Sequence, residues 1–430
     1  MSQKFIKNYD QLSITKERKH ALDILEAGLS AVDTPQAIAE SVKLSNNVLT
    51  IKDRNYNLED FTNILVVGIG KAALAASKKL EEILGPRITD GIILDISEGK
   101  LKYIQSIAGT HPHPSPANVK AAEKISNLLK SAGTQDLIIT IISGGGSALL
   151  CLPHGMNCDQ LTSINKQLFE AGATIQELNT VRKHLSKIQG GQFARMAYPA
   201  KIVSLIFSDI PGDDITMVAS GPTTLDTTTK ADAEQILIKY DVINQCNLGD
   251  CDLVETPKDP QYFSRVDNII VVNNTMATSA MVEKAKLLGY ESSLYSTTLQ
   301  GESQSIGRIL ADQAKPGKVL IAAGETTVKI KQEGEGGRNL EVALGALTKL
   351  RDNTIVISFN SDGKDHVPVG GAIADKTIKK QAQEQNIDLQ KQLDENSSYK
   401  FFKKMGGLID TGPTGINISD LMIVLQPSPT

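Results

Sequence analysis

Residues 64–73 read Ile-Leu-Val-Val-Gly-Ile-Gly-Lys-Ala-Ala and continue as LAASKKLEEIL. A β-branched run that passes through glycines into a stretch of helical composition predicts a buried strand, a tight turn and a helix. The turn matches the GxGxxA form of a dinucleotide fingerprint, with Asp95 as the expected acid. Because Lys71 adds a cation at the helix N-terminus, a phosphate or a small carboxylate fits equally well. A capped turn with a solvated lysine is the alternative.

Further short apolar runs recur along the chain and alternate with stretches of helical composition. They lie at residues 92–94, 137–142, 202–207, 268–272, 319–323, 354–359 and 421–425. Such runs are typical of strands that are buried on both faces of a parallel sheet. The sequence therefore predicts an α/β protein of two lobes, each a mostly parallel sheet wound with helices. We expect the N-terminal lobe to be Rossmann-like and the active site to lie in the interlobe cleft.

The alternation breaks at residues 224–262, which are rich in polar residues and contain glycine and proline. We place the domain boundary there, between an N-terminal domain of residues 1–240 and a C-terminal domain of residues 262–430. A helical region is expected near residues 14–44. The charged stretch 376–404 predicts a solvated helix followed by a loop.

The amino-acid composition limits the classes of molecule that the protein can bind. The 45 Lys and Arg against 49 Asp and Glu leave a net charge of −4, which offers no broad basic field to nucleic acid or a membrane. No apolar stretch has the length of a membrane span or an export signal, so we expect a cytoplasmic protein. Zinc-binding cysteine sets, Cys151-His154-Cys158 or Cys246-Cys251, have no recognised spacing, and reduced cysteines are favoured.

A second glycine-rich string, Ser143-Gly144-Gly145-Gly146-Ser147, directly follows the run at 137–142. Successive N–H groups without side chains in the way can form a nest for phosphate oxygens. A flexible linker is the alternative, but linkers rarely lie between a buried strand and an apolar helix start. The string therefore favours a phosphate site.

Carboxylates follow two of the later runs. Asp209, Asp213 and Asp214 come after residues 202–207, where they suit magnesium or a general base for a hydroxyl. We favour a functional role for Asp209, the nearest to the strand, whereas helix capping is an equal alternative for Asp213 and Asp214. Asp362, which follows residues 354–359, is a further candidate metal ligand.

In the second lobe, one arginine directly follows a glycine-rich segment. Arg338 follows Gly334-Glu335-Gly336-Gly337, and arginine is the side chain best shaped to hold phosphate oxygens by two parallel bonds. In the first lobe, Arg182, Lys183 and His184 are successive on a predicted helix, so at most one or two of them can meet the same ligand. The predicted substrate- or nucleotide-binding residues are Gly68, Gly70, Ser143, Gly144, Gly145, Gly146, Ser147, Arg182, Glu325, Thr326, Asn339, Thr411 and Thr414.

A nest, a lysine at a helix start, an arginine and strand-end carboxylates are the parts that phosphoryl transfer needs. The string GxxxxGK[ST] is absent, which argues against a standard P-loop kinase. Together the strings VVGIGKAA, GTHPHP, ISGGGSALL, LNTVRKHLSKIQGG, SDIPGDDITMVASGPT, AAGETTV, GEGGRNLE and DTGPTGINISDL resemble, in this order, the type II glycerate kinase family, whose C-terminal region is the MOFRL domain.

The resemblance implies ATP-dependent phosphorylation of D-glycerate at its 2-hydroxyl, with magnesium, to give 2-phosphoglycerate. It also implies that Lys71, Asp209 and Arg338 are essential. In our hypothesis Lys71 holds the glycerate carboxylate or the γ-phosphoryl group, Asp209 accepts or orients the hydroxyl proton, and Arg338 stabilises the transferring group. A homodimer is left open, as are two rival functions, an NAD(P)-dependent hydroxypyruvate reductase and a non-catalytic sensor of sugar phosphates.

Several positions depart from the family pattern. Ser115 replaces an acid after the His-Pro-x-Pro string, and His366 replaces the final glycine of TDGxDG. Asn273 and Asn274 follow a valine where GDN is usual, and an acid that is usual near Val369 is missing. We expect these changes to bear mainly on the nucleotide or metal contacts of the second lobe.

Overall fold

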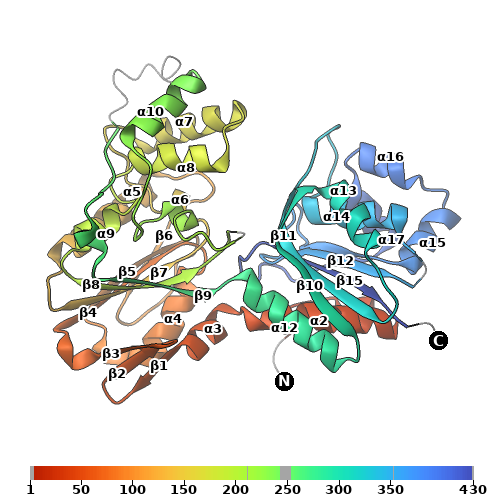
Figure 1. Cartoon of the computed structure of the whole chain (residues 1–430), viewed down its shortest axis with the longest axis horizontal. Coiled ribbons are helices and arrows are strands. Elements are labelled where there is room, and N and C mark those ends of the chain that lie inside the picture. Colours follow the sequence, from red (N-terminus) through yellow and green to blue (C-terminus); the bar gives the residue numbers. More distant parts are fainter. Residues whose placement is uncertain (1–3, 211, 243–252, 352, 429–430) are drawn as a thin grey trace. The chain divides into compact units, whose positions relative to one another are not determined.

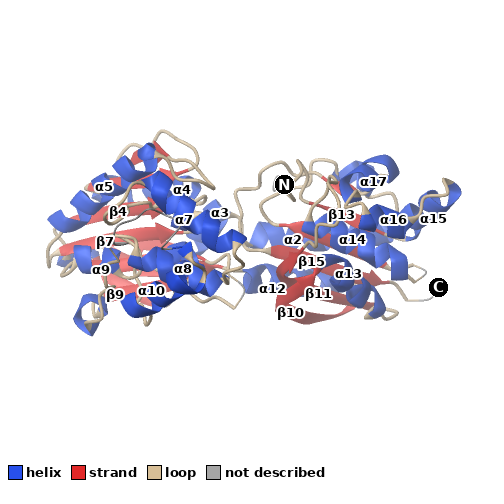
Figure 2. Cartoon of the chain, turned by 90° about the horizontal axis from the view of Figure 1, so that it is seen from above, coloured by secondary structure: helices blue, strands red, loops and turns tan. Residues whose placement is uncertain are grey.

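The computed structural model describes residues 4–210, 212–242, 253–351 and 353–428. The chain forms two compact units, and each is described here by itself. The parallel-sheet unit is Ala37–Val271, and the mixed-sheet unit combines Met1–Gln36 with Val272–Thr430. Figure 2 shows strands and helices in both units, which confirms the predicted α/β class.

The parallel-sheet unit is built on a six-stranded sheet of order β6-β5-β4-β7-β8-β9. The strand pairs β5–β6, β4–β5, β4–β7 and β7–β8 are all parallel, as predicted. The strands are β4 (Asn63–Ile69), β5 (Asp90–Asp95), β6 (Gln105–Ala108), β7 (Asp136–Ile142), β8 (Lys201–Phe207) and β9 (Val266–Val272). Every residue of β7 is buried, because the β-branched run is covered on both faces.

Helices cover both faces of this sheet. In Figure 1, α4 (Ala73–Leu84) lies on one side, and α5 (Pro116–Ser131) and α9 (Gln192–Ala197) lie on the other. A small antiparallel sheet was not predicted, because its strands β1 (Val42–Ser45), β2 (Val48–Ile51) and β3 (Arg54–Asn57) contain no continuous apolar run. The remaining helices are α6 (Gly146–Leu149), α7 (Cys158–Glu170), α8 (Ile175–His184) and α10 (Lys230–Lys239).

The helices α7, α8 and α10 share a separate hydrophobic core. It contains the buried residues Ile164, Leu168, Val181 and Leu237 and is distinct from the core beneath the sheet. This helical subdomain carries Arg182, whose surroundings are described below.

The mixed-sheet unit has the strand order β10-β11-β15-β12-β13-β14. Only β10 and β11 pair in parallel, and the other four pairs are antiparallel. The strands are β10 (Glu291–Glu302), β11 (Lys318–Thr327), β12 (Ile355–Asn360), β13 (Gly371–Ala374), β14 (Leu408–Ile409) and β15 (Asp420–Gln426). The prediction of a mostly parallel second sheet is therefore wrong, because β15 inserts antiparallel between β11 and β12.

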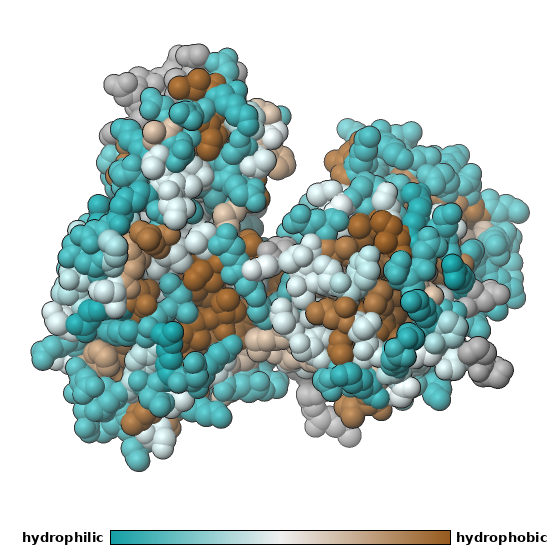
Figure 3. All heavy atoms as spheres, viewed as in Figure 1, coloured by the Kyte–Doolittle hydropathy of each residue, from teal (hydrophilic) through white to brown (hydrophobic). Residues whose placement is uncertain are grey.

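Helices also cover the mixed sheet. Helices α13 (Ser303–Asp312) and α14 (Arg338–Lys349) pack against each other, as do α2 (Lys16–Ala31) and α12 (Asn274–Leu287). The others in this unit are α1 (Tyr9–Leu12), α15 (Lys376–Glu384), α16 (Leu389–Asp394) and α17 (Ser398–Met405), whereas α3 (Thr34–Ser41) spans the boundary between the two units. The visible face of each unit carries both polar and apolar residues (Figure 3).

The two units divide the chain at other places than the predicted ranges of 1–240 and 262–430. Helix α2 belongs to the mixed-sheet unit, where the buried Arg18 donates to both oxygens of Asp375 at 2.6 and 2.8 Å. Strand β9 belongs to the parallel sheet, where it borders β8. Long-range packing, which local composition does not reveal, sets both boundaries.

The charged stretch 376–404 forms three helices, so the prediction of one helix and a loop is wrong. Its apolar residues Ile378, Leu393 and Phe401 are all buried in the core of the mixed-sheet unit. No helix among the described ranges is long and apolar enough to cross a membrane. Cys151 and Cys158 are buried free cysteines, and Cys246 and Cys251 lie outside the described residues.

Candidate functional site

The turn after β4 packs directly onto the turn after β7. Gly70 has a φ of +110°, and a Cβ atom at this residue would lie 2.2 Å from the Ser143 hydroxyl oxygen. The N–H of Lys71 donates to the carbonyl oxygen of Gly144 at 3.0 Å, and the N–H of Ala72 donates to the Ser143 hydroxyl at 3.1 Å. Only glycine allows this approach, which places Lys71 beside the glycine string.

The glycine string forms the predicted strand-to-helix turn. Gly145 has a φ of +81°, and its Cβ would lie 3.2 Å from both Lys71 Cγ and His111 Cδ2. Gly146 begins α6 and is packed against Ala219. Within the described ranges, the N–H groups of Gly144 and Gly145 donate to no protein group. The turn thus offers unused donors next to a cation, as a nest for an anion requires.

Ser147 is held in an internal network. Its hydroxyl shares a hydrogen bond of 2.9 Å with Ser220, whose hydroxyl donates to Asn179 on α8 at 2.8 Å. Gln189 donates through its side-chain amide to the carbonyl oxygens of Ser147 and Leu150, at 2.9 and 3.0 Å. These bonds fix α6 and its glycine turn. Gly68, by contrast, is a packing glycine, because its Cβ would lie 2.6 Å from Ile93 Cγ2.

Lys71 is half-buried and forms no ion pair with any residue that the structure describes. Its effect is visible at His111, where partial desolvation of the ring and the Lys71 cation lower the pKa to about 4. His111 is therefore neutral at physiological pH. A cation without a carboxylate partner at a strand end favours binding of an anionic ligand.

A cavity of about 670 Å³ in the parallel-sheet unit is lined by a second cation that has no carboxylate partner among the described residues. Arg182 on α8 donates through Nε to Asn165 of α7 at 2.8 Å, and burial lowers its pKa. No carboxylate among the described residues forms an ion pair with it. The cavity is lined by His111, Pro112, His113, Pro114, Gly145, Ser147, Ala148, Cys151, Leu161, Thr162, Asn165, Lys166, Phe169, Leu178, Arg182 and Gln189.

The neighbours of Arg182 on α8 do not line the cavity. Lys183 is buried and pairs with Asp226 at 3.3 Å, and the buried His184 hydrogen-bonds the carbonyl oxygen of Thr180 through Nδ1 at 2.8 Å. Of the three successive polar residues, only Arg182 thus faces the cavity, in agreement with the geometric expectation.

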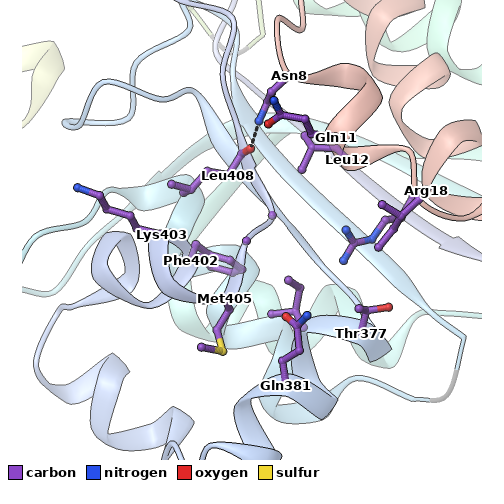
Figure 4. A pocket seen from close by; sticks show the side chains of 14 residues that line it. Asn8, Gln11, Leu12, Arg18, Thr377, Gln381, Phe402, Lys403, Met405 and Leu408 are labelled. Carbon is purple, nitrogen blue, oxygen red and sulfur yellow. Dashed lines mark hydrogen bonds between the residues drawn. The ribbon is translucent and has the colours of Figure 1, made fainter.

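A cavity in the mixed-sheet unit provides a contrast. It measures about 390 Å³ and lies between the N-terminal segment, α15 and α17 (Figure 4). Asn8 donates to the Leu408 carbonyl oxygen at 2.8 Å at its rim. Its buried cation, Arg18, is already neutralised by Asp375. Arg18 is therefore not available to an anionic ligand, and the other cation that lines this cavity is the exposed Lys403.

Asp95 serves the fold. Its carboxylate accepts hydrogen bonds from the N–H groups of Leu74, Ile96 and Ser97 at 2.8, 2.6 and 3.3 Å, and burial raises its pKa. The acid that the dinucleotide fingerprint would direct to a ribose is therefore used to cap α4 and the turn after β5. This observation weakens the reductase alternative.

The carboxylates after β8 occupy one turn. Asp213 has a φ of +57°, and Asp214 accepts bonds from the N–H and hydroxyl of Thr216 at 3.0 and 2.6 Å, as a capping residue does. Asp209 is half-buried at the strand end. Among the described residues, no three His, Cys, Asp or Glu side chains form a metal-binding cluster.

In the mixed-sheet unit, Arg338 begins α14 and is surrounded by carboxylates. Its Nε and Nη2 donate to the two oxygens of Asp420 at 2.7 and 3.0 Å, and its Nη1 donates to Glu325 at 2.5 Å. These carboxylates raise the pKa of Arg338 despite its burial. Burial raises the pKa of Asp420 to about 7. Sequence reasoning missed Asp420, although it opens the last apolar run.

Asn339 extends this network. Its amide donates to Asp420 at 2.9 Å and to Asp365 at 3.3 Å, and its carbonyl oxygen accepts from Ser358 at 2.6 Å. Asp365 also caps α14 through the N–H of Leu340 at 2.9 Å. The predicted residues Arg338, Asn339 and Glu325 are therefore brought together, with Asn339 fully buried as a positioning group.

The glycines before Arg338 pack against the protein itself. A Cβ on Gly334 would lie 2.2 Å from the Glu395 carbonyl oxygen, and one on Gly337 would lie 1.9 Å from that of Asp365. Gly336 is similarly close to the Ser398 hydroxyl, at 2.3 Å. The glycines therefore allow the loop before Arg338 to pack tightly against the protein.

The other predicted binding residues of the mixed-sheet unit form hydrogen bonds outside the network around Arg338. Thr326 is 2% exposed, and its hydroxyl accepts from Ser303 at 3.0 Å. Thr414 donates to the Ser361 carbonyl oxygen at 2.5 Å, and Thr411 donates to that of Gly412 at 2.7 Å. Asp362 accepts from the N–H of Lys364 at 2.8 Å. These contacts hold the turn after β12 against the 411–414 loop.

The departures from the family pattern have clear local roles. Ser115 is the N-cap of α5, where it forms a capping box with Asn118. Asn273 caps α12 by accepting from the N–H of Met276 at 3.0 Å, a bond that an aspartate would also accept. His366 has a φ of +59°, a conformation that favours glycine.

Comparisons with known proteins match this arrangement over nearly the whole chain. Residues 20–248 match a family described as domain of unknown function DUF4147, and residues 318–420 match the MOFRL family. A protein of Pyrococcus horikoshii named glycerate 2-kinase is 35% identical, covering 95% of this chain and 98% of its own. The chain belongs to the type II glycerate kinase family.

Solved structures of the family have the same fold. The crystal structure of glycerate kinase from Thermotoga maritima superposes with a TM-score of 0.83 at 31% identity, covering 95% of this chain and 99% of that one. A relative from Agrobacterium vitis, 35% identical and covering 84% of this chain and 86% of its own, carries the provisional name hydroxypyruvate reductase. The family names thus include both reactions that the sequence left open.

Proposed function

We propose that this protein is a glycerate 2-kinase that transfers the γ-phosphoryl group of ATP to the 2-hydroxyl of D-glycerate, giving 2-phosphoglycerate and ADP. The observation that carries the proposal is the pair of cations, Lys71 and Arg182, that have no carboxylate partner among the described residues of the parallel-sheet unit. Both reactants are anionic, and glycerate 2-kinase is the name of the Pyrococcus horikoshii relative. The observation against a reductase is that Asp95, the acid a dinucleotide fingerprint would direct to a ribose, accepts the N–H of Leu74 in α4 instead.

Arg182 is the residue that we assign to the glycerate carboxylate. Its Nε is held by Asn165, so the two Nη groups can form parallel bonds with two carboxylate oxygens. The mixed polar and apolar wall of the cavity excludes water around this pair and strengthens it. The neutral His111 at the same cavity supplies a hydrogen-bonding group for a substrate hydroxyl.

The glycine turn and Lys71 are assigned to phosphate oxygens. The N–H groups of Gly144 and Gly145 are available as donors, and Lys71 offsets the charge that spreads over the transferring group. Asp209 accepts the proton of the attacking hydroxyl. The family resemblance implies that Arg338, in the mixed-sheet unit, is essential, and we assign it to phosphate oxygens of the transferring group.

The donor chemistry fits a magnesium–nucleotide complex. Magnesium is commonly held by one or two carboxylates together with substrate phosphates and water, so a dedicated cluster of three protein ligands is unnecessary. Asp209 and Asp213 in the turn after β8 are the residues that would hold it. When bound, magnesium would neutralise negative charge on the phosphate groups, as the cationic side chains of this protein also do.

The decisive experiment incubates the purified protein with D-glycerate, ATP and magnesium chloride and identifies the product by phosphorus NMR. We expect ADP and 2-phosphoglycerate, and we expect K71A and D209N to lower the rate roughly 100-fold or more. A parallel incubation with hydroxypyruvate and NADH or NADPH should leave the nicotinamide absorbance unchanged. Oxidation of the nicotinamide without ADP release, or binding of both ligands without turnover, would overturn the proposal.

A further inference from the structure

The guanidinium of Arg338 is held by two carboxylates of very different character. Asp420 is fully buried and takes Nε and Nη2 through both of its oxygens, at 2.7 and 3.0 Å. It opens β15, a strand that pairs with β11 over its full length and with β12 from Asp420 to Leu425. Two parallel bonds from a buried, rigid strand fix the plane of the guanidinium. Asp420 is therefore a permanent anchor for Arg338.

Glu325 is the exchangeable partner. Its side chain is 47% exposed, against 0% for Asp420, and among the described residues its carboxylate accepts one bond, from Nη1 of Arg338. It lies near the end of β11, where successive side chains alternate, so Glu325 points outward while the neighbouring Thr326 is buried. A half-exposed pair with one bond contributes little stability and exchanges readily with another anion.

Arg338 has unused donors beside this exposed bond. A guanidinium carries five N–H groups. Three of them donate to Asp420 and Glu325, which leaves two without a partner among the described residues. Both lie on the Nη nitrogens, because Nε has a single hydrogen that Asp420 accepts. If Glu325 moved away, three donors would be free for the oxygens of an incoming group.

The negative charges around Arg338 determine when a phosphate group can bind to it. Asp420, Glu325 and Asp365 all act on the Arg338 cation. A phosphate that approached with Glu325 still in place would meet a nearby carboxylate of like charge. The bound phosphate and Glu325 therefore compete for the same Nη1 position.

We propose that Glu325 is a placeholder on Arg338, which a phosphate oxygen of the substrate or product displaces when it binds, while Asp420 keeps the guanidinium in position. The proposal rests on the proposed phosphotransferase function. It assigns to Glu325 a role that opposes phosphate binding, whereas the sequence motif alone predicts that Glu325 assists it. The phosphate belongs either to the nucleotide or to the phosphorylated product, and the experiment separates these sources.

The test measures the binding of tripolyphosphate, ATP and 2-phosphoglycerate by isothermal titration calorimetry to the full-length protein. We expect E325Q to bind at least one of them roughly fivefold more tightly than the wild type, because a competing charge is removed. A gain with tripolyphosphate and ATP identifies the nucleotide as the source, and a gain only with 2-phosphoglycerate identifies the product. E291Q is the matched control, since Glu291 also forms one exposed bond of 2.5 Å, to Lys318.

A second pair of variants shows that the gain acts through Arg338. In the R338K background the E325Q substitution should no longer tighten binding, because the lysine lacks the fork that a phosphate would share. The proposal is overturned if E325Q binds all three ligands no more tightly than the wild type, if E291Q gives the same gain, or if the gain persists with R338K. Thermal unfolding of each variant checks that the fold is intact.

Kinetics separate this proposal from the assigned reaction. A protein that turns over glycerate normally but shows no binding gain with E325Q refutes only the placeholder role. A protein that shows the gain but no ADP release refutes only the kinase reaction. In an active enzyme, E325Q should lower KM for the ligand that gains affinity.

Discussion

Gly145 lies directly against the side chain of Lys71: a Cβ atom on Gly145 would be 3.2 Å from Lys71 Cγ and 3.3 Å from Cε. The contact joins the two strand-end turns that carry the nest and the cation. Gly145 also has a φ of +81°, which L-residues with a side chain rarely adopt. A side chain at this position would therefore both strain the turn and push Lys71 away from it.

We expect G145A to lower kcat/KM by roughly tenfold or more, because a displaced Lys71 no longer faces the ligand held by the nest. The loss of stability should be only about 1 kcal/mol. The measurements are initial rates of ADP release and thermal unfolding. G172A is the matched control, since Gly172 has a φ of +83° but no atom within 4 Å of a built Cβ. Equal rates for the two variants would contradict the assigned role of the nest.

Arg182 should determine recognition of the substrate carboxylate. R182K keeps the charge but loses the planar fork, so we expect KM for D-glycerate to rise roughly tenfold or more while KM for ATP changes little. Steady-state kinetics with each substrate varied in turn provide the measurement. R195K, on the exposed Arg195 of α9 in the same unit, is the control. A larger effect on ATP than on glycerate would reassign the cavity to the nucleotide.

The apolar runs predicted eight strands of the two large sheets correctly, since continuous β-branched segments between helices are a local signal. Strand β10 was missed because its sequence, ESSLYSTTLQGE, is rich in serine and threonine and has no apolar run. β13 and β14 are short, with 4 and 2 residues. The antiparallel insertion of β15 depends on pairing between distant segments, which no local pattern records.

In the candidate sites too, some contacts could be predicted from local sequence patterns, whereas contacts between residues far apart in the sequence could not. Lys71 and the glycine string follow adjacent parallel strands, so their proximity could be predicted from the sequence. The bonds from Arg338 to Asp420, 82 positions further on, could not. The glycines at 334, 336 and 337 pack against distant parts of the chain, and the sequence could not show this because glycine accommodates a close protein backbone as readily as a ligand.

The stability of the mixed-sheet unit should depend on pH through Glu341. Burial raises the pKa of this carboxyl from 4.5 to about 7. Because the folded state binds the proton more tightly than the unfolded chain, the resulting stability is complete below pH 4.5 and is lost as pH rises through 7. Asp420, whose pKa is also raised to about 7, acts in the same direction.

E341Q should therefore raise the stability at pH 8 more than at pH 5, by up to about 3 kcal/mol. The glutamine is neutral at both values, and its amide can still accept the bond that Gln304 donates to Glu341 at 2.9 Å. Thermal unfolding midpoints between pH 5 and 8 provide the measurement. The control is E384Q, on an exposed glutamate of α15. If wild type and E341Q lost stability in parallel across this range, the titration of Glu341 would not be the cause.

His366 occupies a position where the family usually has glycine, and the backbone conformation of this position explains why glycine is usual. Its φ of +59° lies in the left-handed region, which costs a residue with a Cβ about 1 kcal/mol. H366G removes that strain but increases the entropy of the unfolded chain, so we expect the unfolding midpoint to stay unchanged or to rise slightly. K364G, two positions earlier and also exposed, has no such strain to relieve and should lower the midpoint. Equal losses in both variants would show that histidine gains a compensating contact in this turn.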